Sequence, residues 1–181
     1  MSDDENTPEE GADTDEVEAQ PTPEMRYDAI VADSLGDVVL HPARDHYLDT
    51  MAAAKDDGFD QLIDLTAVDF LAYAAPRGLP SGIDAERFEV VTQLINHDSG
   101  ERIRVRVQVP ADEPTVASLF DLWPGSEALE REVFDMFGIE FADHPDMSRI
   151  LMPEDWVGHP LRKDYAVGSI PVQFKAASNI R

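Results

Sequence analysis

The chain has 181 residues, a formal net charge of −24 and no cysteine. Without cysteine it can form neither disulfide bonds nor cysteine-held zinc or iron–sulfur centres, and it has no thiol nucleophile. The negative field disfavours binding to nucleic acids and to anionic membrane surfaces. No apolar run approaches the ~20 residues of a membrane span, and the first ten residues lack the features of a secretory signal. We therefore expect a soluble chain on the cytosolic side.

The first 24 residues contain ten acidic residues and neither lysine nor arginine. With so few large apolar side chains they cannot bury enough surface to offset chain entropy. Residues 1–24 are therefore predicted to be a disordered acidic tail that aids solubility. An acidic tail that binds a partner is the alternative.

Two strands with a helix between them are predicted next. "GDVVL" (Gly36–Leu40) is typical of a short strand. Proline lies near the start of a predicted helix, Pro42–Asp57, and Gly58 occupies the position that commonly follows a helix. "QLIDLTAVDF" (Gln61–Phe70) is rich in β-branched and apolar residues and predicts a second strand.

A hairpin is the clearest local prediction. "RFEVVTQLI" (Arg87–Ile95) and "RIRVRVQV" (Arg102–Val109) flank the turn-like "NHDSGE". In the second strand, apolar residues alternate with Arg102, Arg104 and Arg106, so one face is apolar and the other carries three guanidinium groups. We expect these arginines to pair with carboxylates of this chain or of a partner; an anion site is the alternative.

Two further helices are predicted after the hairpin. Pro114–Leu122 is expected to form a short one. Ser126 is placed to cap a second helix, Glu127–Phe137, whose apolar residues share one face. Gly138 is predicted to end this helix.

Charged residues on the second helix are spaced to pair with each other. Arg131 lies four residues from both Glu127 and Asp135, which predicts two ion pairs along the helix surface. Glu130 and Glu132 would then be free to reach another segment.

Residues 141–181 are predicted to form an irregular arm with short helical turns, because proline and glycine recur there without a long periodic stretch. Irregular segments of about 40 residues are uncommon in compact domains unless they have a function. The arm also carries many apolar residues that should not stay in water. It either packs on its own sheet or lies on a partner, and the pattern favours an interaction arm. The apolar residues are Ile150, Leu151, Met152, Trp156, Val157, Leu161, Tyr165, Ile170, Val172 and Phe174.

Together the elements predict an α+β fold, with a largely antiparallel sheet covered by helices and an extended irregular C-terminal arm. We expect three regions. They are the disordered tail (1–24), an α+β sheet domain (25–122), and the helix 127–137 with its extended docking arm (123–181).

Catalytic and metal sites have little support in the sequence. Glu130 and Glu132 are two residues apart on a helix and do not face each other, and no H-E-x-x-H pattern occurs. Motifs of serine hydrolases, dinucleotide binding and P-loops are also missing. His144 and His159 each precede a proline and are interpreted as turn residues. The possible metal ligands are Glu130, Glu132, Asp135, His144, Asp146 and His159.

The segment "EREVFDMFGIEFADHPDMSRILMPEDWVGHPLRKDY" (Glu130–Tyr165) closely resembles the motif of the respiratory complex I 30 kDa subunit family, the C subunit of bacterial NADH-quinone oxidoreductase. "DLTAVDF", "RFEVVTQLI" and "DEPTVASLFDLWPG" match the family's order upstream, so the resemblance covers roughly residues 60–174. The closing "GSIPVQFK" looks like actinobacterial-type members. Ala128 stands where the family usually has a tryptophan.

The resemblance implies a non-catalytic subunit of the peripheral arm of proton-translocating NADH:quinone oxidoreductase (complex I, NDH-1). This enzyme of the respiratory chain passes electrons from NADH through FMN and iron–sulfur centres to a quinone. The chain itself is expected to bind no cofactor, since FMN and the clusters belong to partner subunits. Its implied partners are the D subunit (49 kDa type), which it would scaffold near the quinone site, and others such as B and I. It would be peripheral to the cell membrane, on the cytoplasmic side.

The motif is interpreted as a subunit-docking element whose charges satisfy polar groups at a subunit boundary. One alternative is the equivalent subunit of a ferredoxin- or F420-linked quinone reductase or of a membrane-bound hydrogenase. The other is a free-standing acid–base enzyme that uses His144 and the helix carboxylates. The expected docking residues are Glu130, Arg131, Glu132, Asp135, His144, Asp146, Arg149, His159, Arg162, Lys163 and Asp164.

Overall fold

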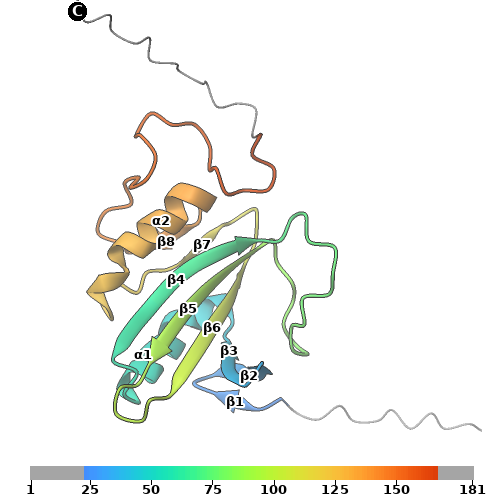
Figure 1. Cartoon of the computed structure of the whole chain (residues 1–181), viewed down its shortest axis with the longest axis vertical. Helices are drawn as coiled ribbons and strands as arrows, with labels where there is room; N and C mark the ends of the chain where they lie inside the picture. The colour runs from blue at the N-terminus through green and yellow to red at the C-terminus, as the bar shows by residue number, and fades with distance from the viewer. Residues whose placement is uncertain (1–22, 167–181) are drawn as a thin grey trace, which may run out of the picture.

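The computed structural model describes residues 23–166 (Figure 1). Most of the expected acidic tail and the last 15 residues lie outside this part. Among the described residues, neither helix has the length and apolar character needed to cross a membrane.

Six strands form one mixed sheet, in which β3 and β6 are parallel and the other neighbours are antiparallel. The predicted α+β fold with a largely antiparallel sheet is therefore confirmed. The predicted strands at residues 36–40 and 61–70 correspond to β3 and β4. In spatial order the strands are β1 (Met25–Arg26), β2 (Ala29–Ser34), β3 (Asp37–His41), β6 (Arg102–Val109), β5 (Phe88–Ile95) and β4 (Gln61–Asp69).

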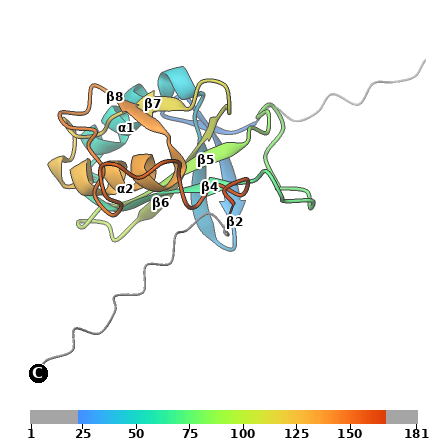
Figure 2. The ribbon, with the colours of Figure 1, turned by 90° about the horizontal axis from the view of Figure 1, so that it is seen from above.

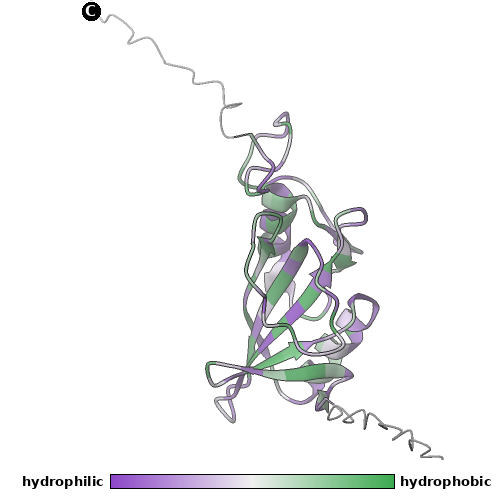
Figure 3. Cartoon of the chain, turned by 90° about the vertical axis from the view of Figure 1, so that its right-hand side faces the viewer, coloured by the Kyte–Doolittle hydropathy of each residue, from purple (hydrophilic) through white to green (hydrophobic). Residues whose placement is uncertain are grey.

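The predicted hairpin is formed by β5 and β6, which pair from Phe88 opposite Val109 to Ile95 opposite Arg102. Polar and apolar residues alternate along the strands (Figure 3). The predicted pairing of the arginine face with carboxylates of this chain is confirmed for two side chains. Arg104 lies 2.9 Å from Asp37, and Arg106 lies 2.7 Å from Glu89.

Both helices lie against the same face of the sheet (Figure 2). α1 (Tyr47–Asp56) follows a 3-10 turn at Arg44–His46, within the predicted range of 42–57. α2 (Glu127–Phe137) has the predicted bounds. Side chains of α1, α2 and the inner sheet face form one hydrophobic core, so the helix at 127–137 shares the core of the sheet.

The predicted helix at Pro114–Leu122 is wrong. Residues Thr115–Ala117 form the strand β7, which pairs in parallel with β8 (Glu140–Ala142). Only nine residues support the helix reading, whereas Val116 and Leu119 are both buried in the core in the observed arrangement. Pairing with a strand distant in sequence therefore outweighs the weak local preference.

The outer face of the sheet holds a buried charge cluster that no motif indicates. Glu89 is 1% exposed and accepts hydrogen bonds from Arg106, from Gln108 and from Arg77 in the loop after β4. His41 lies on β3, next to the strand β6 that carries Arg106, and is 2% exposed. The loop that carries Arg77 thus covers part of a face that would otherwise be open to solvent.

Candidate functional site

α2 is the element on which the motif residues converge. It is amphipathic, with Val133, Met136 and Phe137 in the core. Gly138 ends the helix in the left-handed conformation with φ of 69°, as predicted. The predicted cap by Ser126 is wrong, because this residue belongs to the preceding 3-10 turn and its buried hydroxyl has no hydrogen-bond partner in the described chain.

Asp135 is the centre of the contacts between α2 and the arm. Its buried carboxylate lies 2.6 Å from Nη1 of Arg149 and accepts the backbone N–H groups of Ile150, Leu151 and Met152 at 3.2, 2.7 and 2.8 Å. Burial raises the pKa of this carboxyl, but the hydrogen bonds outweigh burial and the pKa lies below its ordinary value. Asp135 is thus an ionised acceptor that fixes the arm.

Arg131 also contacts the arm, and one of its two predicted ion pairs is wrong. The pair with Glu127 is present at 3.1 Å. Arg131 does not pair with Asp135; it donates instead to the carbonyl and hydroxyl oxygens of Ser148 and to the carbonyl of Arg149. Asp135 is occupied by donors from the arm, so the arm residues replace the expected helix pair.

Glu130 is fully buried and holds α2 to the segment after β7. It accepts hydrogen bonds from the hydroxyl of Ser118 at 2.6 Å and from the backbone N–H of Leu119 at 2.7 Å. Glu132 is exposed, and no hydrogen bond or ion pair of its side chain is observed within residues 23–166. Ala128 is also exposed, so the missing tryptophan leaves the core unchanged.

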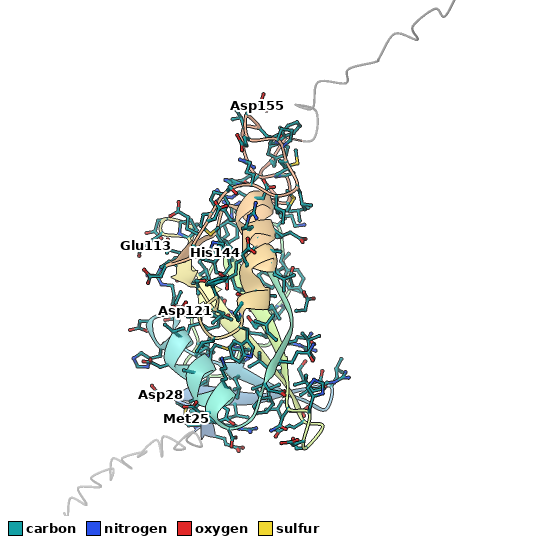
Figure 4. All side chains as sticks on the ribbon, turned by 90° about the vertical axis from the view of Figure 1, so that its left-hand side faces the viewer. Met25, Asp28, Glu113, Asp121, His144 and Asp155 are labelled. Carbon is teal, nitrogen blue, oxygen red and sulfur yellow. The ribbon has the colours of Figure 1, made fainter. Side chains whose placement is uncertain are left out.

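The two histidines donate to carbonyl groups of the helix. His144 accepts the N–H of Asp146 at Nδ1, which leaves Nε2–H to donate to the carbonyl of Glu127 at 3.2 Å. His159 donates from Nδ1 to the carbonyl of Asp135 at 3.0 Å. Burial lowers the pKa of His159 although this hydrogen bond raises it, and in the neutral ring the bond places the proton on Nδ1. In Figure 4, His144 lies beside α2 and Asp155 lies at the tip of the arm.

The last described part of the arm caps the helix. Arg162 donates from Nε to the carbonyl of Phe137 and from Nη2 to the carbonyl of Gly138. The N–H of Leu161 donates to the carbonyl of Met136 at 3.0 Å. Carbonyl groups at a helix C-terminus lack partners within the helix and favour a positive charge, so the arm satisfies both needs.

Asp69 on β4 is a residue that the sequence reasoning missed. Its buried carboxylate accepts from Arg87, from the N–H of Leu71 and from the N–H of Lys163 at 2.8 Å. Arg87 also lies 2.8 Å from Asp164. Burial raises the pKa of Asp69, but these bonds outweigh it and the pKa lies below its ordinary value. The alternation of Leu65, Ala67 and Asp69 on the inner face was the available signal.

The structure therefore uses most of the motif's polar groups inside the chain. Of the eleven expected docking residues, only the side chains of Glu132 and Lys163 have no hydrogen bond or ion pair observed within residues 23–166. The arm's apolar side chains are not all buried in this way. Met147 and Met152 pack against the core, while four others are exposed to solvent. The exposed apolar residues of the arm are Ile150, Leu151, Val157 and Leu161, at 41, 59, 86 and 48% exposure.

Within the described residues, no group of three His, Cys, Asp or Glu side chains is arranged to hold a metal ion. Glu130, Asp135 and Asp69 each accept from donors of this chain, and each is buried. The site as it stands is suited to holding an extended segment in a fixed shape.

The chain belongs to the family described as respiratory-chain NADH dehydrogenase, 30 Kd subunit, whose sequence model matches residues 40–170. It is 42% identical over 146 residues to NADH-quinone oxidoreductase subunit 5 of Thermus thermophilus, a match that covers 78% of this chain and 67% of that protein. The resemblance found in the sequence is thereby confirmed.

Two solved structures have a similar fold. Nqo5, in the structure of its trypsin-resistant fragment (1-134), has 37% identity and a TM-score of 0.58, over 65% of this chain and 89% of that chain. A chain of the membrane-bound sulfane sulfur reductase, an archaeal respiratory membrane complex, has 23% identity and a TM-score of 0.63, over 85% of this chain and 91% of that chain.

Proposed function

We propose that this chain is the C-type subunit of a proton-translocating NADH:quinone oxidoreductase and acts there as a scaffold, without catalytic residues or a cofactor of its own. Its arm would dock on the D-type subunit near the quinone site, with subunits such as B and I as further neighbours. FMN and iron–sulfur centres would belong to those partners. The chain would be held at the cytoplasmic side of the cell membrane through the assembly.

One observation carries the proposal. The arm's polar groups are satisfied on α2 and β4, whereas Ile150, Leu151, Val157 and Leu161 remain exposed. An ordered segment that exposes several large apolar side chains is typical of a surface that another protein covers. The relative in Thermus thermophilus is named as a subunit of an NADH-quinone oxidoreductase, which supports another subunit of the same enzyme as the covering protein.

The motif charges then act in a different way from the one expected from the sequence. Instead of reaching across to the partner, most of them hold the arm on α2 and so present its apolar side chains in a fixed arrangement. Glu132 and Lys163 are the expected docking residues whose side chains remain available for direct contact with a partner.

The proposal is tested by substitutions in the arm. We expect Leu151→Asp and Val157→Asp to leave the melting temperature of the isolated chain nearly unchanged, because both side chains are exposed. In an assembly purified through a tag on the D-type subunit, each should lower the content of this chain at least tenfold. Leu48→Asp is the matched control, since Leu48 on α1 is 40% exposed and lies outside the arm.

Turnover separates a scaffold from a catalytic subunit. Assemblies that retain Arg149→Ala or Asp164→Ala chains should reduce quinone at the normal rate per assembled complex. Full assembly with lost turnover would contradict the scaffold role. Assembly at the normal level with both Leu151→Asp and Val157→Asp would contradict docking through the arm.

The same preparation tests the electron donor. The archaeal reductase has the same fold, so the fold does not distinguish an NADH-linked assembly from its relatives. NADH should support quinone reduction by the purified assembly. Activity with reduced ferredoxin or F420 and none with NADH would instead assign the chain to a related complex.

A further inference from the structure

The turn between β2 and β3 holds a leucine whose backbone and side chain are both placed unfavourably. Ser34 pairs with Asp37, so Leu35 and Gly36 form a two-residue hairpin turn. Both have positive φ, 59° and 88°. Such turns favour Asn-Gly or Asp-Gly, because larger side chains resist the left-handed region. Leu35 is 103% exposed, so no part of the described chain buries its side chain.

The turn between β1 and β2 shows how such a backbone is usually stabilised. Tyr27 and Asp28 also have positive φ, 53° and 61°. Tyr27 packs against the core and its hydroxyl donates to Asp57, while Asp28 lies 2.6 Å from His46. These contacts favour the fold and offset the strained conformation. Leu35 has no comparable burial within residues 23–166, so contacts of this part of the chain do not explain a leucine there.

The charges beside Leu35 indicate what it would bind. Asp33 is exposed and accepts the N–H of Gly36 at 3.3 Å, and Asp37 is exposed and paired with Arg104. The tip thus presents one large apolar side chain beside Asp33, which has no cationic partner within residues 23–166, whereas Asp37 is paired with Arg104. Its complement is an apolar pocket whose rim carries positive charges or N–H donors.

The hairpin is also separate from the arm. β2 and β3 lie at the opposite end of the molecule from the arm (Figure 1), and the hairpin extends away from α1 and α2 (Figure 2). A contact made by this tip would therefore hold the chain at a second, distant point.

We propose that Leu35 is an anchor that inserts into an apolar, basic-rimmed pocket of a neighbouring subunit in the assembly. The inference rests on the proposed function, because it takes the partner to be another subunit of the same complex. A leucine that becomes buried at the centre of a small contact stabilises association. In the free chain the same residue only makes the turn conformation less favourable in free energy.

Three variants of Leu35 in the full chain separate the backbone from the side chain. Leu35→Asn favours the turn and removes the apolar group, so the melting temperature of the isolated chain should rise by about 2–4 °C. Its release from the purified assembly during a salt wash should be about tenfold faster. Leu35→Ala should release as fast without the gain in melting temperature, and Leu35→Met should be retained like the wild type.

Release at the wild-type rate for both Leu35→Asn and Leu35→Ala would overturn the inference, and so would a Leu35→Asn chain that melts no higher than the wild type. An effect of Leu35→Asn on self-association of the isolated chain alone would assign the tip to a second copy and also overturn it. If Leu151→Asp releases the chain but Leu35→Asn does not, only this inference fails. If the wild-type chain never accompanies the other subunits, the proposed function fails first.

Discussion

His41 is a residue whose ionisation is set mainly by burial and not by any motif. It lies at the end of β3 and is 2% exposed, and its Nδ1 has no hydrogen-bond partner among the described residues. Burial lowers the pKa of His41 to about 4, and Arg106 adds to this effect while Glu89 opposes it. The folded chain therefore keeps this imidazole neutral at pH values where a free histidine is charged.

Stability should consequently fall as the pH is lowered from about 7.5 to 4. In this window the unfolded chain binds a proton at His41 and the folded chain does not, so protons favour unfolding. Relative to His41→Leu, the wild type should lose about 3 kcal/mol of unfolding free energy across the window. Urea denaturation at a series of pH values measures the difference. A constant difference between the two chains would mean that His41 titrates normally in the folded state.

Arg131 and Asp135 show how much of the site the sequence could predict at this scale. Their spacing correctly places both on one side of a helix, and the pair with Glu127 is observed, but the arm covers this side and Asp135 is fully buried. The sequence could not show that Asp135 would meet three consecutive amides and Arg149. Those donors come from a segment without periodicity, so nothing local specifies where it lies.

Among the helices and strands, too, the sequence predicts those with a clear local pattern and not those that depend on distant contacts. β5, β6 and α2 were predicted with nearly their observed bounds, because each has a clear period of two or 3.6 residues. β7 and β8 were not, since each is three residues long and exists through its partner. β1 and β2 were missed because the turns beside β2 hold Tyr27-Asp28 and Leu35-Gly36 in place of the usual turn residues.

Gly138 links α2 to the arm at the scale of elements. A Cβ atom there would lie 2.5 Å from Nε2 of His159 and 2.7 Å from Nη2 of Arg162, and its φ is 69°. We expect Gly138→Ala to destabilise the isolated chain by about 2 kcal/mol, through backbone strain and displacement of both side chains. Chemical denaturation provides the measurement. Gly125→Ala is the matched control, because nothing lies within 4 Å of its Cβ position and the effect should be small.

At the scale of the whole molecule, the sheet and the arm differ in what holds them. The sheet, α1 and α2 share one hydrophobic core, whereas the arm is attached mainly by hydrogen bonds and ion pairs. Segments with few buried apolar contacts open at lower free energy than a core does. The arm should therefore be the part of the isolated chain that opens first.

Limited trypsin digestion tests this difference. Within residues 23–166, the first cuts should fall after Arg149, Arg162 or Lys163, and the sheet should survive as a resistant fragment. Asp135→Asn should speed cleavage after Arg149 about tenfold, because Asp135 holds the N–H of the following residue, Ile150. Mass spectrometry of the fragments identifies the sites. Early cleavage within β4–β6 would contradict this order of opening.

The anchoring of the arm by backbone groups has a consequence for the kinetics of assembly. Side chains of α2 bind main-chain atoms of the arm, as Arg131 and Asp135 do, and Arg162 of the arm binds a carbonyl of α2. The path of the arm is therefore already defined in the single subunit. The arm therefore loses little conformational entropy when the subunits meet, because most of that entropy was already lost when the single subunit folded. The subunit can then bind its partner almost as a rigid body. Its association rate is expected to depend on diffusion and orientation, and not on a slow rearrangement of the arm.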